Sequence, residues 1–124
     1  MTLTVAKIDR ETDQLVGEWL PLSEVSKRLG LTIGRAKQLL KDKKLVGVRR
    51  GGGEPQIPAA FVGDADVLKG LPGTLTVLSD AGYDEVESIR WLFTPDPTLP
   101  GSPIDAISAG RHTEVKRRAQ ALGF

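Results

Sequence analysis

The chain has 124 residues, of which 40% are apolar and 27% are charged, so it can form one ordinary domain or two small ones that share a core. It contains no cysteine, which excludes disulfides and thiolate metal sites. No apolar run approaches the roughly 18 residues of a membrane span, and no signal-peptide pattern opens the chain. We therefore expect a cytoplasmic protein that does not contact a membrane.

The net charge of +1 conceals an uneven distribution. Residues 27–50 hold nine Lys or Arg and a single acid, Asp42, and carry +8. Residues 51–110 hold two basic and nine acidic groups and carry −7. Such polarity attracts a polyanion to one part of the molecule and repels it from the rest.

Residues 1–17 are polar and contain few large apolar groups, so we expect a flexible arm there. A helix is predicted from Ser23, as its N-cap, to Gly30, which can adopt the positive φ of a helix end. Thr32 is predicted to cap a second helix over residues 33–42. The apolar stripe of that second helix would consist of Ile33, Ala36, Leu39 and Leu40.

Two short extended runs, 45–50 and 54–58, flank three consecutive glycines and predict a β-hairpin. Pro55 and Pro58 would confine its second strand to a sheet edge. Beyond this hairpin the pattern is helical. It predicts a short turn at residues 59–62 and helices over 72–81, 85–93, 103–109 and 113–122.

The expected fold is mainly α with a small β-hairpin, a winged helix-turn-helix followed by a helical C-terminal module. The expected division is a flexible arm over residues 1–17, the winged helix-turn-helix over 18–62, and the C-terminal module, packed on it, over 63–124.

The helix-turn-helix would present a basic outward face that suits double-stranded DNA. Arg35 and Gln38 have the donor geometry for guanine and adenine edges, whereas Lys37 and Lys41 suit phosphates. The hairpin would act as a wing whose arginines project from its tip towards the minor groove or the backbone. The residues expected to contact DNA are Thr32, Arg35, Lys37, Gln38, Lys41, Lys43, Lys44, Arg49 and Arg50.

Other interpretations of these charges are weaker. A basic amphipathic helix is often only a solvated face, and RNA would be attracted by the same cations. Only one aromatic residue, Trp19, flanks the basic region, which gives little support for base stacking. The second basic patch, formed by Arg111, Lys116, Arg117 and Arg118, would either complement a helix dipole or add a phosphate or dimer contact.

Enzymatic activity is not expected. The chain has a single histidine, His112, no cysteine and no clustered carboxylates, so the sequence offers no catalytic residues, no metal ligands and no cofactor site. The three glycines at 51–53 lack the strand and GxxxxGK context of a phosphate-binding loop.

Several segments together resemble a known family. They are residues 19–50, 71–78 and the string RWLFTPDP at 90–97. These segments are similar to those of small actinobacterial winged helix-turn-helix DNA-binding proteins that are substrates of a Ser/Thr protein kinase. The tail also resembles the C-terminal domain of Xre/ParS-type antitoxins in Trp91-Leu92, Pro95-Asp96-Pro97, Leu99, Gly101 and Pro103-Ile104-Asp105-Ala106.

The resemblance implies a cytoplasmic, nucleoid-associated DNA-binding protein with a phosphoregulated threonine in its N-terminal arm. The arms do not match, so it indicates no single position, and the candidates are Thr2, Thr4 and Thr12. Three functions remain open. They are a transcriptional regulator, an antitoxin-like module that binds a protein partner and regulates its own gene, and an architectural binder without sequence preference.

Overall fold

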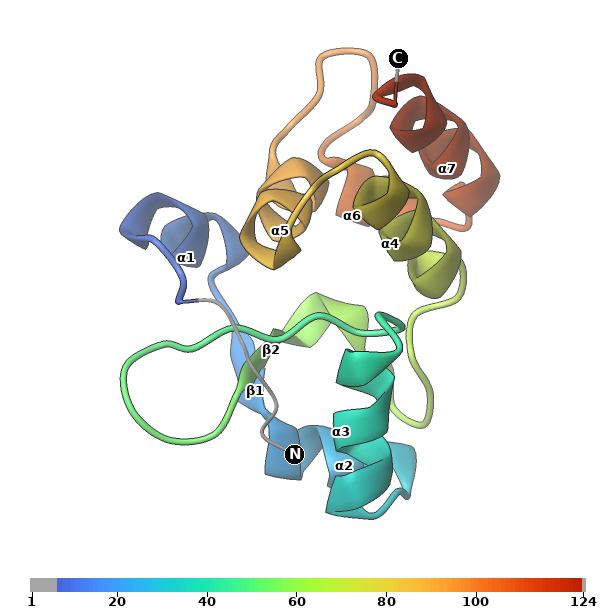
Figure 1. Cartoon of the computed structure of the whole chain (residues 1–124). Helices are drawn as coiled ribbons and strands as arrows, with labels where there is room; N and C mark the ends of the chain where they lie inside the picture. The colour runs from blue at the N-terminus through green and yellow to red at the C-terminus, as the bar shows by residue number, and fades with distance from the viewer. Residues whose placement is uncertain (1–6, 124) are drawn as a thin grey trace.

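The protein is described by a computed structural model that covers residues 7–123. Over these residues it forms seven α-helices, one short 3-10 helix and two short strands (Figure 1). In chain order they are α1 (Arg10–Val16), β1 (Trp19–Pro21), α2 (Leu22–Leu29), α3 (Ile33–Lys41), β2 (Gln56–Pro58), η1 (Ala59–Phe61), α4 (Leu71–Asp80), α5 (Glu85–Phe93), α6 (Pro103–Ser108) and α7 (His112–Ala121).

The first difference from the sequence analysis is α1, which occupies part of the expected flexible arm. Asp9 caps this helix, because its carboxylate accepts a hydrogen bond from the Thr12 backbone N–H at 3.1 Å. Thr12 is fully buried against α5, where its hydroxyl donates to Asp9 and accepts from Arg90 Nε at 3.0 Å. The expectation was wrong for these residues, because polar contacts to α5 hold the helix together with Ile8 and Val16, which pack against the core.

The helix-turn-helix forms where the sequence predicts it. Gly30 ends α2 with a φ of 65°, and the Thr32 side chain caps α3 by accepting a hydrogen bond from the Arg35 N–H at 3.1 Å. The first cap differs from the prediction, since Pro21, not Ser23, occupies the N-cap position of α2. The Ser23 N–H instead donates to a carboxylate oxygen of Glu54, 31 residues along the chain.

The apolar stripe of α3 is shorter than predicted. Ala36 and Leu40 are buried and Leu39 is partly buried, but Ile33 is 46% exposed. Ile33 lies in the first turn of α3, one turn before Ala36, and the core does not extend that far. Ile33, the first residue of the predicted stripe, therefore lies outside the core.

The sheet differs from the predicted hairpin. β2 pairs in antiparallel fashion with β1, in the register Trp19↔Pro58. The run at 45–50 makes only isolated bridges, from Val48 to Gln56 on β2 and from Arg49 to Lys7. Pro58 has no N–H to donate, so the bridge between Val48 and Gln56 is not continued by a bonded pair at residue 58. The wing is consequently a loop over residues 49–55, closed at its base by that one bridge.

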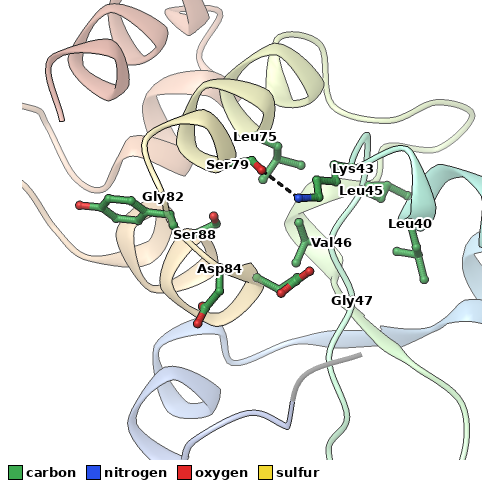
Figure 2. Close-up of a pocket in the computed structure, with 12 residues that line it drawn as sticks. Leu40, Lys43, Leu45, Val46, Gly47, Leu75, Ser79, Gly82, Asp84 and Ser88 are labelled. Carbon is green, nitrogen blue, oxygen red and sulfur yellow. Dashed lines mark hydrogen bonds between the residues drawn. The ribbon is translucent and has the colours of Figure 1, made fainter. Parts of the chain in front are cut away.

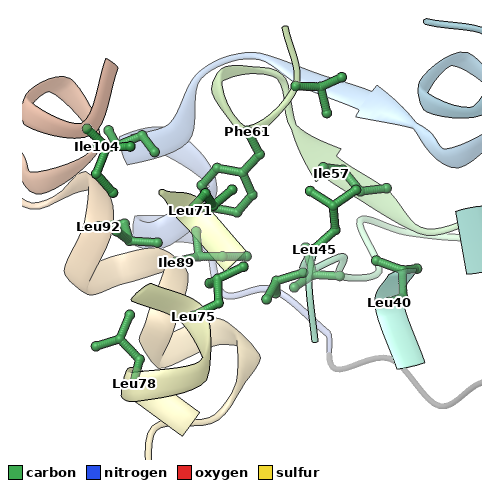
Figure 3. Close-up of a cluster of buried hydrophobic side chains, with 14 of the residues drawn as sticks. Leu40, Leu45, Ile57, Phe61, Leu71, Leu75, Leu78, Ile89, Leu92 and Ile104 are labelled. Atoms are coloured by element: carbon green, nitrogen blue, oxygen red, sulfur yellow. The ribbon is translucent and has the colours of Figure 1, made fainter. Parts of the chain in front are cut away.

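A single hydrophobic core joins the two halves of the chain. Figure 3 shows Leu45, Ile57 and Phe61 from the first half in one cluster with Leu71, Leu75 and Ile89 from the second. The Phe61 ring also lies 5.7 Å from that of Phe93 at the end of α5. The four C-terminal helices, α4 to α7, pack on one another and begin and end within one residue of their predicted bounds.

The arrangement leaves α2 and α3 at the opposite end of the molecule from α6 and α7 (Figure 1). The wing loop extends sideways from the same end as the helix-turn-helix. No helix over residues 7–123 has the length and apolarity that crossing a membrane would require.

Candidate nucleic-acid interface

The outward face of α3 carries the densest free positive charge of the helix-turn-helix. Arg35, Lys37 and Lys41 are exposed, and none of them forms an ion pair within residues 7–123. Gln38 is also exposed, and its Nε2 donates to Asp42 Oδ1 at 2.9 Å. The sequence analysis placed these four side chains on one outward face, and the structure leaves all four accessible to a ligand.

The start of α3 adds to this positive character. The helix has no acidic residue in its first turn, so the partial positive charge of its N-terminus is not offset there. Thr32 is exposed, but its oxygen already accepts the capping hydrogen bond. Its hydroxyl hydrogen is free to donate to an anion next to the helix end.

Lys43 and Lys44 follow α3 and differ in their surroundings. Lys44 is exposed and unpaired among the described residues. Lys43 has a positive φ of 58°, and its Nζ donates to Ser79 Oγ on α4 at 2.9 Å (Figure 2). Lys43 was predicted to contact DNA, but its ammonium group points towards the C-terminal helices.

A cleft of about 320 Å³ lies beside Lys43, between the end of α3 and the α4–α5 region (Figure 2). Its floor is apolar, and Ser79, Asp84 and Ser88 supply polar groups on the α4–α5 side. Lys43 thus spans the boundary between the two halves of the chain.

The two wing arginines also differ from each other. Arg49 is exposed, and its carbonyl accepts a hydrogen bond from the Ile8 N–H at 3.1 Å. Arg50 is bound to α1, because its Nε and Nη2 donate to the two oxygens of Asp13 at 2.8 and 3.0 Å. The Arg50 guanidinium also lies 5.0 Å from the centre of the Trp19 ring. Both arginines were predicted to project from the wing tip, and for Arg50 that prediction is wrong.

The contact between Arg50 and Asp13 has an electrostatic signature. Hydrogen bonding from Arg50, together with its positive charge, lowers the pKa of the Asp13 carboxyl below its ordinary value. The carboxylate therefore stays ionised, and the pair persists, over the whole physiological pH range.

The base of the wing is fixed by a second carboxylate. Glu54 accepts the Ser23 N–H at 2.6 Å, and this hydrogen bond lowers the pKa of Glu54. The contact supplies the N-terminus of α2 with the capping group that Pro21 lacks. It also sets the position of the wing relative to the helix-turn-helix.

Sequence reasoning missed the carboxylates that hold the wing. Asp13 and Glu54 lie 37 and 31 residues from their partners, and no local pattern connects them. For Asp13 a general signal is present, because residues 1–26 hold five acidic and two basic groups and precede the basic segment.

The second basic patch is largely neutralised. Arg111 and Arg118 both pair with Glu114, at 2.6 and 3.1 Å, and Arg118 also approaches Asp96 at 3.6 Å. Lys116 and Arg117 are exposed without an ion pair among residues 7–123. Two of the four cations therefore stabilise α7 and its neighbouring loop.

The three candidate phosphorylation sites fall into two groups. Thr12 is 0% exposed and fully hydrogen-bonded, so a kinase cannot reach its hydroxyl while α1 lies on α5. Thr2 and Thr4 lie outside the described residues.

Comparison with known proteins gives consistent matches along the chain. Residues 7–62 match the family described as the DNA-binding protein Rv2175c winged helix-turn-helix domain, and residues 68–123 match the Rv2175c C-terminal domain of unknown function. The DNA-binding protein Rv2175c of Mycobacterium tuberculosis is 42% identical over 115 residues, covering 83% of this chain and 79% of the relative.

A solved structure agrees with the sequence matches. The NMR structure of Rv2175c superimposes with a TM-score of 0.80 at 34% identity, covering 100% of this chain and 91% of that one. The family resemblance and the winged helix-turn-helix fold expected from the sequence are thereby confirmed. The chain belongs to the family of winged helix-turn-helix proteins that includes the mycobacterial DNA-binding protein Rv2175c.

Proposed function

We propose that this protein binds double-stranded DNA and acts as a transcriptional regulator, with α3 in the major groove and the wing on the adjacent backbone or minor groove. The observation that carries the proposal is the set of exposed, unpaired cations on α3, namely Arg35, Lys37 and Lys41. The second helix of a helix-turn-helix is the element that enters the major groove. The mycobacterial relative Rv2175c is itself called a DNA-binding protein.

Each side chain on α3 has a distinct role in this proposal. Arg35 presents a guanidinium fork that fits the O6 and N7 acceptors of guanine. Gln38 exchanges its exposed hydrogen bond with Asp42 for the edge of an adenine. Lys37 and Lys41 neutralise phosphates on the two sides of the groove, which makes affinity dependent on salt concentration.

The wing supplies further backbone contacts. Arg49 is free to meet a phosphate, and Lys44 lies on the segment that leads to the wing. Arg50 reaches DNA only after it leaves Asp13, so its contribution is smaller than that of an unpaired arginine.

Regulation of this binding by a Ser/Thr protein kinase is a further part of the proposal. The N-terminal segment enters the described structure at Lys7, which bridges the wing residue Arg49. A phosphate on Thr2 or Thr4 would add a charge of about −1.5 to −2 within five residues of Lys7 along the chain and so oppose the binding of DNA. Thr12 is not favoured, because its hydroxyl is buried.

The kinase proposal is tested with glutamate substitutions. Thr2→Glu combined with Thr4→Glu is expected to weaken DNA binding at low salt without changing stability. Thr12→Glu is expected instead to lower stability, because it places a carboxylate in a buried site beside Asp9. Unchanged DNA affinity in the Thr2→Glu, Thr4→Glu variant would show that a negative charge on the N-terminal segment does not regulate binding.

The DNA proposal is tested by selecting bound duplexes from a random pool at near-physiological salt. The salt dependence of the selected duplex is then measured for two double variants, Lys37→Ala with Lys41→Ala, and Lys116→Ala with Arg117→Ala as a charge-matched control. Loss of two phosphate contacts should flatten the slope of log affinity against log salt by about 1.8 in the first variant only. An equal effect in the control would move the interface to the C-terminal helices.

The same experiment separates the alternative functions. Equal binding of random and selected duplexes would indicate an architectural protein, and a preference for RNA over duplex DNA would contradict the proposal. An antitoxin-like role would be indicated by a small protein partner that binds the C-terminal helices and changes DNA affinity.

A further inference from the structure

Ile33 is an exposed branched side chain on an otherwise polar surface. Over residues 7–123, Ile33 and Leu15 on α1 are the two large hydrophobic residues that are exposed. Ile33 is 46% accessible, whereas Ala36, one turn further along α3, is completely buried. Thr32, which precedes Ile33, and Lys37, one turn further along the same side of α3, are both exposed.

The position of Ile33 in the helix explains its exposure. It is the first residue of α3, directly after the N-cap Thr32, so it lies at the open end of the helix. The following residue is Gly34, where even an added Cβ would approach only the Thr32 hydroxyl oxygen, at 3.9 Å. The local sequence therefore leaves one face of Ile33 uncovered at the end of the recognition helix.

The end of a recognition helix is the part that approaches base edges most closely, since its N-terminal residues make the contacts there. The missing side chain at Gly34 allows that end of the backbone to approach the floor of the groove. The floor of the major groove presents hydrogen-bonding groups and one exposed apolar group, the C5-methyl of thymine. A branched aliphatic side chain has no hydrogen bond to offer and fits only that methyl.

We propose that Ile33 contacts the C5-methyl group of a thymine at the N-terminal end of α3 and so specifies a T·A base pair there. This inference rests on the proposed DNA-binding function and assigns to α3 a specificity determinant that carries no charge. Phosphate contacts by Lys37 and Lys41 would hold the helix in the groove, and Ile33 would add discrimination at one base pair.

The test uses the selected duplex and replaces its thymines by deoxyuridine, one at a time, which removes only the methyl group. The wild-type protein should lose about four-fold in affinity at one position per binding site, as expected for about 0.8 kcal/mol per buried methyl-sized group. Ile33→Ala should bind more weakly and show no further loss at that position. Ile33→Val should remain sensitive to the replacement.

Leu15→Ala is the matched control, because it truncates the other exposed aliphatic side chain and leaves α3 intact. It should keep the wild-type sensitivity to deoxyuridine. Circular dichroism establishes that each variant is folded, which the exposure of both residues predicts.

The outcomes separate this inference from the proposed function. Selective binding of a duplex whose affinity is unaffected by deoxyuridine at every position would overturn the role of Ile33 and leave DNA binding intact. Retained sensitivity in Ile33→Ala would do the same. If deoxyuridine had no effect on binding and Ile33→Ala lost self-association, Ile33 would instead contact a second copy of the protein. Absence of any selective duplex would overturn both proposals.

Discussion

The contact between Arg50 and Asp13 predicts that α1 limits DNA binding by the wing. Replacing Asp13 by Asn keeps the size of the side chain and removes its charge. Arg50 then loses its ionic partner and is free to meet a phosphate. We therefore expect Asp13→Asn to bind DNA more tightly than the wild-type protein.

The magnitude follows from the geometry of the pair. The two hydrogen bonds measure 2.8 and 3.0 Å, but the Arg50 and Asp13 side chains retain 34% and 30% of their exposure. Solvent screening at such exposure limits the pair to about 0.5–1 kcal/mol, which corresponds to a two- to five-fold gain in affinity. The expected increase in the salt slope is about 0.9, for one additional phosphate contact.

The assay is fluorescence anisotropy of a labelled duplex over a range of salt concentrations. Glu11→Gln is the matched control, because it removes the same charge from α1 at a residue that is exposed and unpaired within residues 7–123. The gain of Asp13→Asn should exceed that of Glu11→Gln, and Arg50→Ala should abolish the excess. If Asp13→Asn and Glu11→Gln gave equal gains in affinity, both with Arg50 present and with Arg50→Ala, Arg50 would not exchange between Asp13 and DNA.

Three further predictions concern stability. Gly70→Ala should lower the free energy of unfolding in urea by at least about 2 kcal/mol more than Gly82→Ala. Both glycines have positive φ, but only at Gly70 would the added Cβ clash with His112 Cβ. Thr12→Val should lower the free energy of unfolding by about 1–2 kcal/mol, since it removes buried hydrogen bonds, and an unchanged midpoint would contradict that role. The lowered pKa of Asp13 gives stability that is present above the ordinary carboxyl pKa of about 3.9 and is lost as pH falls through the lower folded value. Acid should therefore release α1 from the wing, which tryptophan fluorescence can follow. The change should be smaller in Asp13→Asn, which has no carboxylate at this position.

The elements with strong local signals could be predicted from the sequence. The left-handed Gly30, the Thr32 cap and the capping boxes of α5 and α6 depend on residues only a few positions apart. α3 and the C-terminal helices therefore agree with their predicted bounds to within about a residue at each end, whereas α2 begins two residues before its predicted start.

The features that failed depend on contacts between distant segments. α1 is held by Arg90 from α5 and by Arg50 from the wing, and neither contact leaves a pattern within residues 1–17. β2 pairs with β1 and makes one bridge to the run at 45–50, where Pro58 lacks the N–H that a further bonded pair would need.

The candidate site shows the same division. Sequence periodicity places Arg35, Lys37, Gln38 and Lys41 on the outward face, because that face follows from helix geometry alone. The exposure of Ile33 could not be predicted, since it depends on where the core ends. That Arg50 is held in an ion pair with Asp13 likewise could not be predicted, because it depends on the three-dimensional position of Asp13.

The most direct test of the central claim is an NMR titration of isotope-labelled protein with the selected duplex, read at the backbone amides. The largest shift changes are predicted at residues 32–41 of the recognition helix and at residues 49–53 of the wing, with little change over α6 and α7. Changes confined to α4–α7, with the amides of α3 unaffected at saturation, would contradict the placement of the interface.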